Sequence, residues 1–84
     1  MGRGSRLRPK HLGKKLKRIR EALELSQAAM CKELGFKSVY PSHISGYERG
    51  TREPPYPVLL KYARLVGIST DILIDDKLEI FSNK

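Results

Sequence analysis

The sequence predicts a compact all-α domain of five short helices, with a flexible basic arm before it and a short extended tail after it. The chain has only 84 residues, which suffices for one domain with a modest core. Its apolar residues recur at three- and four-residue intervals, as on one face of a helix. Ser, Gly and Pro stand between these segments, where helices begin and end. We therefore divide the chain into an arm over 1–9, a domain over 10–76 and a tail over 77–84.

The arm and the first helix differ in the spacing of their apolar residues. Residues 1–9 contain Gly, Ser and Pro with one Leu, a composition typical of a flexible segment. Beyond them, one apolar stripe recurs at helical spacing, and Lys and Arg occupy the other faces. The stripe consists of Leu12, Leu16, Ile19 and Leu23. This pattern predicts a first helix over residues 10–24.

The next two helices are indicated by the residues at their ends. Ser26 can cap a helix over 27–34, and Gly35 can end it in the left-handed conformation. Pro41 suits the first turn of a third helix, because its missing N–H would have no partner there. We expect that helix over 41–49, with a glycine directly after it.

Residues at the helix ends also predict the last two helices, and an alternating pattern predicts the tail. Pro57 can open a fourth helix, whose apolar stripe stops at Gly67. Ser69 can cap a fifth, short helix from 70 to 73 or 74. Beyond it, residues 77–81 alternate polar and apolar side chains briefly, which is typical of a strand or an extended tail.

The distribution of charge predicts a polyanionic partner. The formal net charge is +8, and the first 20 residues hold nine basic side chains and no acidic one. The other 64 residues carry eight basic and nine acidic side chains, so the excess is confined to one end. A basic block on a nearly neutral body favours binding to nucleic acid, either DNA or RNA, or to an anionic membrane surface. The alternative is a basic segment that only keeps the chain soluble.

Several other classes of protein are disfavoured by the sequence. No apolar run approaches the roughly 20 residues of a bilayer span, and no secretory signal is present, so we expect a soluble, cytoplasmic protein. Cys31 is the only cysteine and predicts no internal disulfide. Two separated histidines, His11 and His43, offer no paired ligand spacing and no catalytic constellation. We expect neither an enzyme nor a metal or cofactor site.

Two short helices joined through a glycine favour a helix-turn-helix motif. Two runs sharpen this interpretation, namely Leu25-Ser26-Gln27 and the segment 44–54, Ile-Ser-Gly-Tyr-Glu-Arg-Gly-Thr-Arg-Glu-Pro. Between them stand Cys31, at a small-residue position, and Gly35. In this order the runs resemble the lambda-repressor-like (Xre/Cro) helix-turn-helix family, over about residues 12–74.

This resemblance implies a bacterial-type transcriptional regulator, expected to be a repressor, that places helix 41–49 in the major groove of double-stranded DNA. The base-reading residues would be Ser42, His43 and Ser45. The phosphate-binding residues would be Gln27, Lys37, Arg49, Thr51 and Arg52. The arm would contact DNA through Arg3, Arg6, Arg8 and Lys10. The resemblance also implies a structural ion pair between Arg20 and Glu48.

The sequence departs from the family pattern in the turn and on the third helix. Between Gly35 and Ile44 it has about three extra residues, so the turn over 36–40 is enlarged. Pro41 and Gly46 stand where family members often have long outward side chains. We therefore expect few direct contacts between side chains of this helix and base edges.

Two questions stay open at the level of sequence. A protein-interaction module, such as an antitoxin or a partner-binding regulator, is the alternative function. The tail could form a homodimer contact or pack on its own helices, because leaving its apolar side chains in water is unfavourable. These side chains are Leu78, Ile80 and Phe81.

Overall fold

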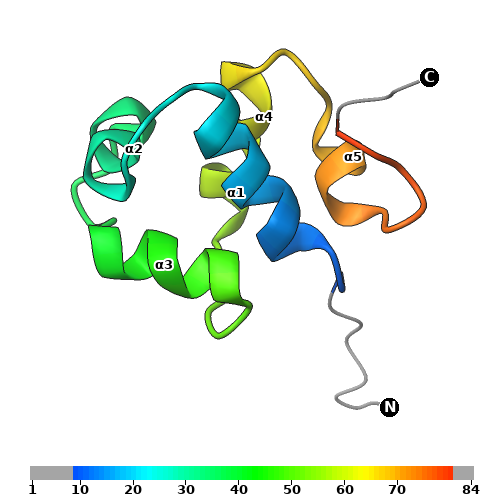
Figure 1. Cartoon of the computed structure of the whole chain (residues 1–84), viewed down its shortest axis with the longest axis horizontal. Coiled ribbons are helices and arrows are strands. Elements are labelled where there is room, and N and C mark those ends of the chain that lie inside the picture. Colours follow the sequence, from blue (N-terminus) through cyan, green and yellow to red (C-terminus); the bar gives the residue numbers. More distant parts are fainter. Residues whose placement is uncertain (1–8, 81–84) are drawn as a thin grey trace.

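Five helices follow one another in residues 9–80, the part of the chain that the computed structural model describes. They are α1 (Leu12–Ala22), α2 (Gln27–Leu34), α3 (Pro41–Arg49), α4 (Tyr56–Leu65) and α5 (Thr70–Ile74). In Figure 1, α1 lies centrally, with α2 and α3 on one side of it and α5 on the other. The all-α prediction is confirmed, and no strand occurs within this range. None of these helices is long and apolar enough to cross a membrane.

The first helix is shorter at both ends than the predicted range 10–24. At its C-terminal end, Glu24 has φ of +59°, a left-handed conformation in which a helix cannot continue. At its N-terminal end, the Asp76 carboxylate accepts hydrogen bonds from the backbone N–H groups of Lys10 (2.8 Å) and His11 (3.0 Å). A residue near the other end of the chain therefore fixes where α1 begins.

The boundaries of α2 and α3 agree with the sequence prediction. The Ser26 hydroxyl accepts a hydrogen bond from the Ala29 N–H at 3.0 Å, which satisfies one of the free donors of the first turn of α2. Gly35 and Gly50 end the two helices with φ of +77° and +78°. A side chain would be strained at such angles, so glycine is the residue that these two chain reversals require.

The core gathers apolar side chains from all five helices. Its fully buried members are Leu16, Ile19, Met30, Ile44, Tyr62 and Leu73. Ile80 belongs to the same core, with 6% of its surface exposed, whereas Leu78 is 41% exposed. Part of the predicted tail therefore packs against the chain's own helices.

Lys15, in the basic block of the sequence, is a buried structural residue. Only 6% of its surface is exposed, and its ammonium group donates to the carbonyl oxygens of Ile72 (2.7 Å) and Asp75 (2.9 Å). These carbonyls lie at the C-terminal end of α5, where helix carbonyls lack intrahelical partners and a cation is favourable. The positive charge of Lys15 thus joins α1 to α5 and does not face a polyanion.

Stability is expected to depend on pH through Asp76. Hydrogen bonds from the backbone N–H groups of Lys10 and His11 hold the pKa of this carboxyl below its ordinary value of 3.8. A lowered folded-state pKa stabilises the protein above the unfolded value and loses that contribution as pH falls through the folded value. Wild type should therefore melt higher than Asp76→Asn at near-neutral pH, and the difference should vanish in acid. A difference in melting temperature that is constant across this titration would contradict the prediction.

Candidate nucleic-acid interface

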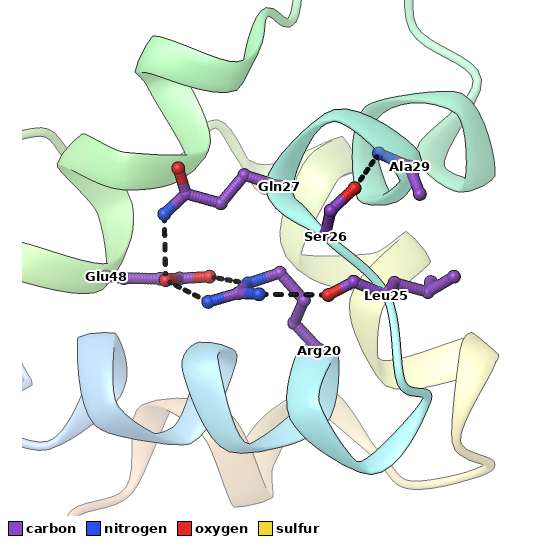
Figure 2. Close-up of polar contacts among 6 residues, drawn as sticks. All are labelled: Arg20, Leu25, Ser26, Gln27, Ala29 and Glu48. Carbon is purple, nitrogen blue, oxygen red and sulfur yellow. Dashed lines mark hydrogen bonds and ion pairs between the residues drawn. The ribbon is translucent and has the colours of Figure 1, made fainter.

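The ion pair between Arg20 and Glu48 holds α3 against α1. Figure 2 shows the guanidinium and the carboxylate facing each other. The distance from Nε to Oε2 is 2.7 Å, and that from Nη2 to Oε1 is 3.1 Å. The Arg20 Nη1 also donates to the carbonyl oxygen of Leu25 at 2.9 Å. The two side chains are 14% and 5% exposed, and the hydrogen bond to Glu48 raises the pKa of Arg20. This bidentate contact fixes the orientation of α3 relative to α1.

Gln27, at the start of α2, belongs to the same network. Its side-chain amide donates to Glu48 Oε1 (Figure 2), at a distance of 3.3 Å. The side chain is half-buried. One amide hydrogen is thus directed to the carboxylate, which leaves the second for any contact outside the protein. A phosphate-binding role for Gln27 stays a prediction that would use this second hydrogen.

The predicted base-reading residues lie in the first half of α3. Ser42 is exposed, and His43 and Ser45 are half-buried. His43 is the third residue of the helix, and its ring Nδ1 accepts a hydrogen bond from the backbone N–H of Tyr40 at 3.1 Å. Three polar side chains are therefore accessible at the start of this helix, and one of them also serves as its cap.

Gly46 does not face outward, which corrects the expectation drawn from the sequence. It is buried under the segment that follows α3, and its carbonyl oxygen accepts from the N–H groups of Thr51 (3.0 Å) and Arg52 (3.2 Å). A Cβ atom built at Gly46 would lie 3.0 Å from the Cβ of Arg52. The glycine thus lets the 51–52 loop fold closely over α3, and a long reading side chain has no place there.

Predicted phosphate-binding residues at the end of α3 and in the loop after it lie beside Lys10. Arg49 and Arg52 line one surface hollow of about 180 Å³ with Lys10, and Glu48 and Glu53 line it too. Arg49, Thr51 and Arg52 are all exposed, as is the more distant Lys37. The other predicted arm residues, Arg3, Arg6 and Arg8, lie outside the described residues. The structure therefore places the loop after α3 beside the base of the predicted arm.

The enlarged turn over 36–40 is anchored at two points. Val39 is buried in the core at 8% exposure, and Phe36 packs against the same core. A backbone hydrogen bond joins Val39 N–H to the Phe36 carbonyl at 3.3 Å. Tyr40 follows with 58% of its surface exposed. The additional residues thus form a closed turn and present an aromatic ring beside the first turn of α3.

Comparison with known proteins places this arrangement in a family. The family model described as helix-turn-helix matches residues 16–73. The chain belongs to this helix-turn-helix family. It is 35% identical over 63 residues to the HTH-type transcriptional regulator ImmR of Bacillus subtilis (strain 168). That match covers 75% of this chain and 47% of ImmR, so the chain spans about half the length of this relative.

A solved structure supports the same assignment. The helix-turn-helix chain is similar to the P22 c2 repressor protein, determined in complex with synthetic operator 9T, with a TM-score of 0.67 and 31% sequence identity. The similarity covers 77% of this chain and 94% of the repressor chain. Together with the ImmR match, it confirms that the chain is of the lambda-repressor-like type.

The single cysteine of this helix-turn-helix domain is a packing residue. Cys31 is half-buried against the core, and burial raises the pKa of its thiol. A raised pKa lowers the fraction of thiolate, the reactive form. Across residues 9–80, no group of three or more His, Cys, Asp or Glu side chains is arranged to hold a metal ion.

Proposed function

We propose that this chain binds double-stranded DNA in a sequence-dependent manner and represses transcription by occupying its site. The observation that carries the proposal is the geometry of α3. Its start presents Ser42 and His43, Arg49 ends it and Arg52 lies in the loop that follows, and the Arg20–Glu48 pair fixes its orientation. The solved repressor with the same fold was determined on an operator, which supports this assignment. We further propose a non-catalytic protein that resides on DNA in the cytoplasm.

The exposed residues divide into two roles under this proposal. Contacts to phosphates position a protein on any duplex, whereas contacts to base edges distinguish one sequence from another. Arg49 and Arg52 would bind phosphates beside Lys10, and Lys37, Thr51 and Gln27 would extend that contact. Ser42, His43 and Ser45 would read bases from the major groove. Since serine and histidine lack the bidentate reach of Arg or Asn, the electrostatic share of the affinity should be large.

The two roles should be separable by mutation. Arg49→Ala or Arg52→Ala should weaken binding to every duplex and reduce the slope of log affinity against log salt by about 0.9 per lost phosphate contact. Ser42→Ala should instead flatten the preference at one base pair, with roughly 1–3 kcal/mol of discrimination lost. Deleting residues 1–9 should reduce the salt slope as well. Binding isotherms over a salt series, on a site selected from a random duplex library, measure both effects.

A variant at a basic residue outside the predicted contact surface is the control for this experiment. Arg64→Ala removes an exposed positive charge from the last turn of α4, outside the predicted contact residues, and should leave the salt slope nearly unchanged. Equal affinity of the wild type for all selected and random duplexes, or for DNA, RNA and anionic vesicles alike, would show that the protein is a general polyanion binder. Failure to bind any duplex would favour the protein-interaction alternative.

We also propose that two copies bind DNA together through the tail, since helix-turn-helix domains commonly read two half-sites as dimers. Ile80 is buried in the chain's own core, so the contact would rest on the exposed Leu78 and on Phe81, which lies outside the described residues. Leu78→Ser should then lower the dimer fraction in sedimentation experiments while leaving the melting temperature of the monomer unchanged. A dimer fraction equal to that of the wild type would remove the tail from the interface.

A further inference from the structure

His43 is tied to the residue that precedes α3 by two hydrogen bonds and a ring contact. Its ring Nδ1 accepts from the Tyr40 N–H at 3.1 Å, and its own N–H donates to the Tyr40 carbonyl oxygen at 2.8 Å. The two aromatic rings lie with their centroids 5.5 Å apart, tilted by 45°. The imidazole therefore occupies the place that Glu or Gln takes in a capping box, at the third position of the helix.

The first of these bonds determines where the ring proton resides. A nitrogen that accepts a hydrogen bond carries no hydrogen, and a neutral imidazole has one N–H, so the proton of His43 is on Nε2. Among residues 9–80, no side chain or backbone group accepts a hydrogen bond from this Nε2. The ring thus offers one free polar atom, and that atom is a donor.

We propose that His43 reads DNA as a hydrogen-bond donor only, with guanine as its partner; this inference rests on the proposed function. In the major groove, guanine presents two acceptors, O6 and N7, whereas adenine presents one acceptor and the N6 donor. Specific recognition of adenine uses a side chain that both donates and accepts. The acceptor of His43 is occupied by the Tyr40 N–H, so the ring can donate to O6 or N7 of guanine but cannot accept from the N6 group of adenine. Thymine offers only the O4 acceptor, beside its methyl group, so guanine presents the fuller acceptor edge to a lone donor.

Three variants separate the cap from the reading role. His43→Gln keeps both functions, because the glutamine oxygen can accept from the Tyr40 N–H while its NH₂ group donates outward. His43→Glu keeps the cap but has no donor. His43→Ala removes both. If the proposal holds, His43→Gln retains guanine at the affected base pair, although an unconstrained glutamine favours adenine. The other two variants lose the preference there.

The tautomer is tested without DNA. Nitrogen-15 spectra of the histidine-labelled protein, recorded with the ring neutral, should show His43 protonated at Nε2 with an accepting Nδ1. The His11 ring provides the internal control, because its residue precedes α1 without a side-chain capping bond. The Tyr40 amide should exchange faster in His43→Ala than in His43→Gln. A ring protonated at Nδ1, or equal exchange in both variants, would overturn the inference and leave the proposed function intact.

The base contact is tested by selection from a random duplex library with the wild type and each variant. We expect one position at which the wild type prefers guanine to adenine by about tenfold, near the lower end of the range for a single base contact. That preference should be absent in His43→Ala. No position that changes between the two proteins, or any base other than guanine as the wild-type choice at the position that changes, would overturn the guanine contact. The absence of any sequence preference in the wild type would instead refute the proposed function, and with it this contact.

Discussion

Replacing Glu48 by Ala is expected to lower the free energy of unfolding by roughly 3–5 kcal/mol, the range for removing one partner of a buried ion pair. The carboxylate is 5% exposed and accepts from two guanidinium nitrogens of Arg20 and from the Gln27 amide. Without it, the guanidinium of Arg20 keeps only the Leu25 carbonyl as a described partner. A charge left in a largely buried site without its counterion accounts for this magnitude. Urea denaturation measures the change directly.

A matched control distinguishes this effect from the general loss of a carboxylate. Glu33 is an exposed acid on α2, and Glu33→Ala should change the free energy of unfolding by no more than about 0.5 kcal/mol. Glu48→Gln, which keeps the shape and one oxygen acceptor, should fall between the two. If Glu48→Ala and Glu33→Ala had equal unfolding midpoints, the pair would not be what holds α3 against α1.

Gly13→Ala is the second substitution with a large expected effect. A Cβ atom at this position of α1 would lie 2.6 Å from the carbonyl oxygen of Glu48 and 2.8 Å from that of Tyr47. Both atoms belong to the backbone of α3, so the clash cannot be relieved by turning a side chain. Overpacking of this kind costs about 1–3 kcal/mol or more, and it outweighs the gain of up to about 1 kcal/mol from the higher helix propensity of Ala.

The measurement for Gly13→Ala has two parts. The melting temperature should fall, and DNA binding should weaken at temperatures where the variant is still folded, because a displaced α3 no longer presents its residues in the original orientation. Lys17→Ala, on the exposed face of the same helix, is the control for the change in helix propensity. A variant Gly13→Ala that is as stable as Lys17→Ala would show that the two helices can separate without cost.

Local residue chemistry accounts for the part of the fold that the sequence predicted. Ser26, Gly35 and Pro41 act on the backbone within a few residues of themselves, so the boundaries of α2 and α3 could be placed before any tertiary contact was known. The sequence also predicts an enlarged turn over 36–40. Its closed shape could not be predicted, because it depends on burial of Val39 in a core assembled from other helices.

Contacts between distant parts of the chain account for what the sequence did not predict. Lys15 appeared as one cation in a basic block, since nothing near it in sequence indicates that its partners are 57 and 60 residues away. Likewise, nothing near Asp76 in sequence indicates that its carboxylate binds the backbone at Lys10 and His11. Gly46 was expected to face outward because the position of a residue on a helix does not reveal which loop will cover it. Candidate DNA-facing residues could be named from the resemblance and stay a prediction, but the capping role of His43 required the structure.

The bonds that Lys15 and Asp76 make bear on when this protein can fold as it is synthesised. They join α1 to the segment around α5 across 57 to 66 residues. Closing a loop of that length costs conformational entropy that local helix formation does not recover, and contacts of such high separation slow folding. While the chain grows from the ribosome, the start of α1 lacks the Asp76 carboxylate until nearly the whole domain has emerged. The Lys15 ammonium group lacks its carbonyl partners on Ile72 and Asp75 for almost as long. The first helix of this domain is therefore completed last, and the native state should be acquired only after Asp76 has left the ribosome.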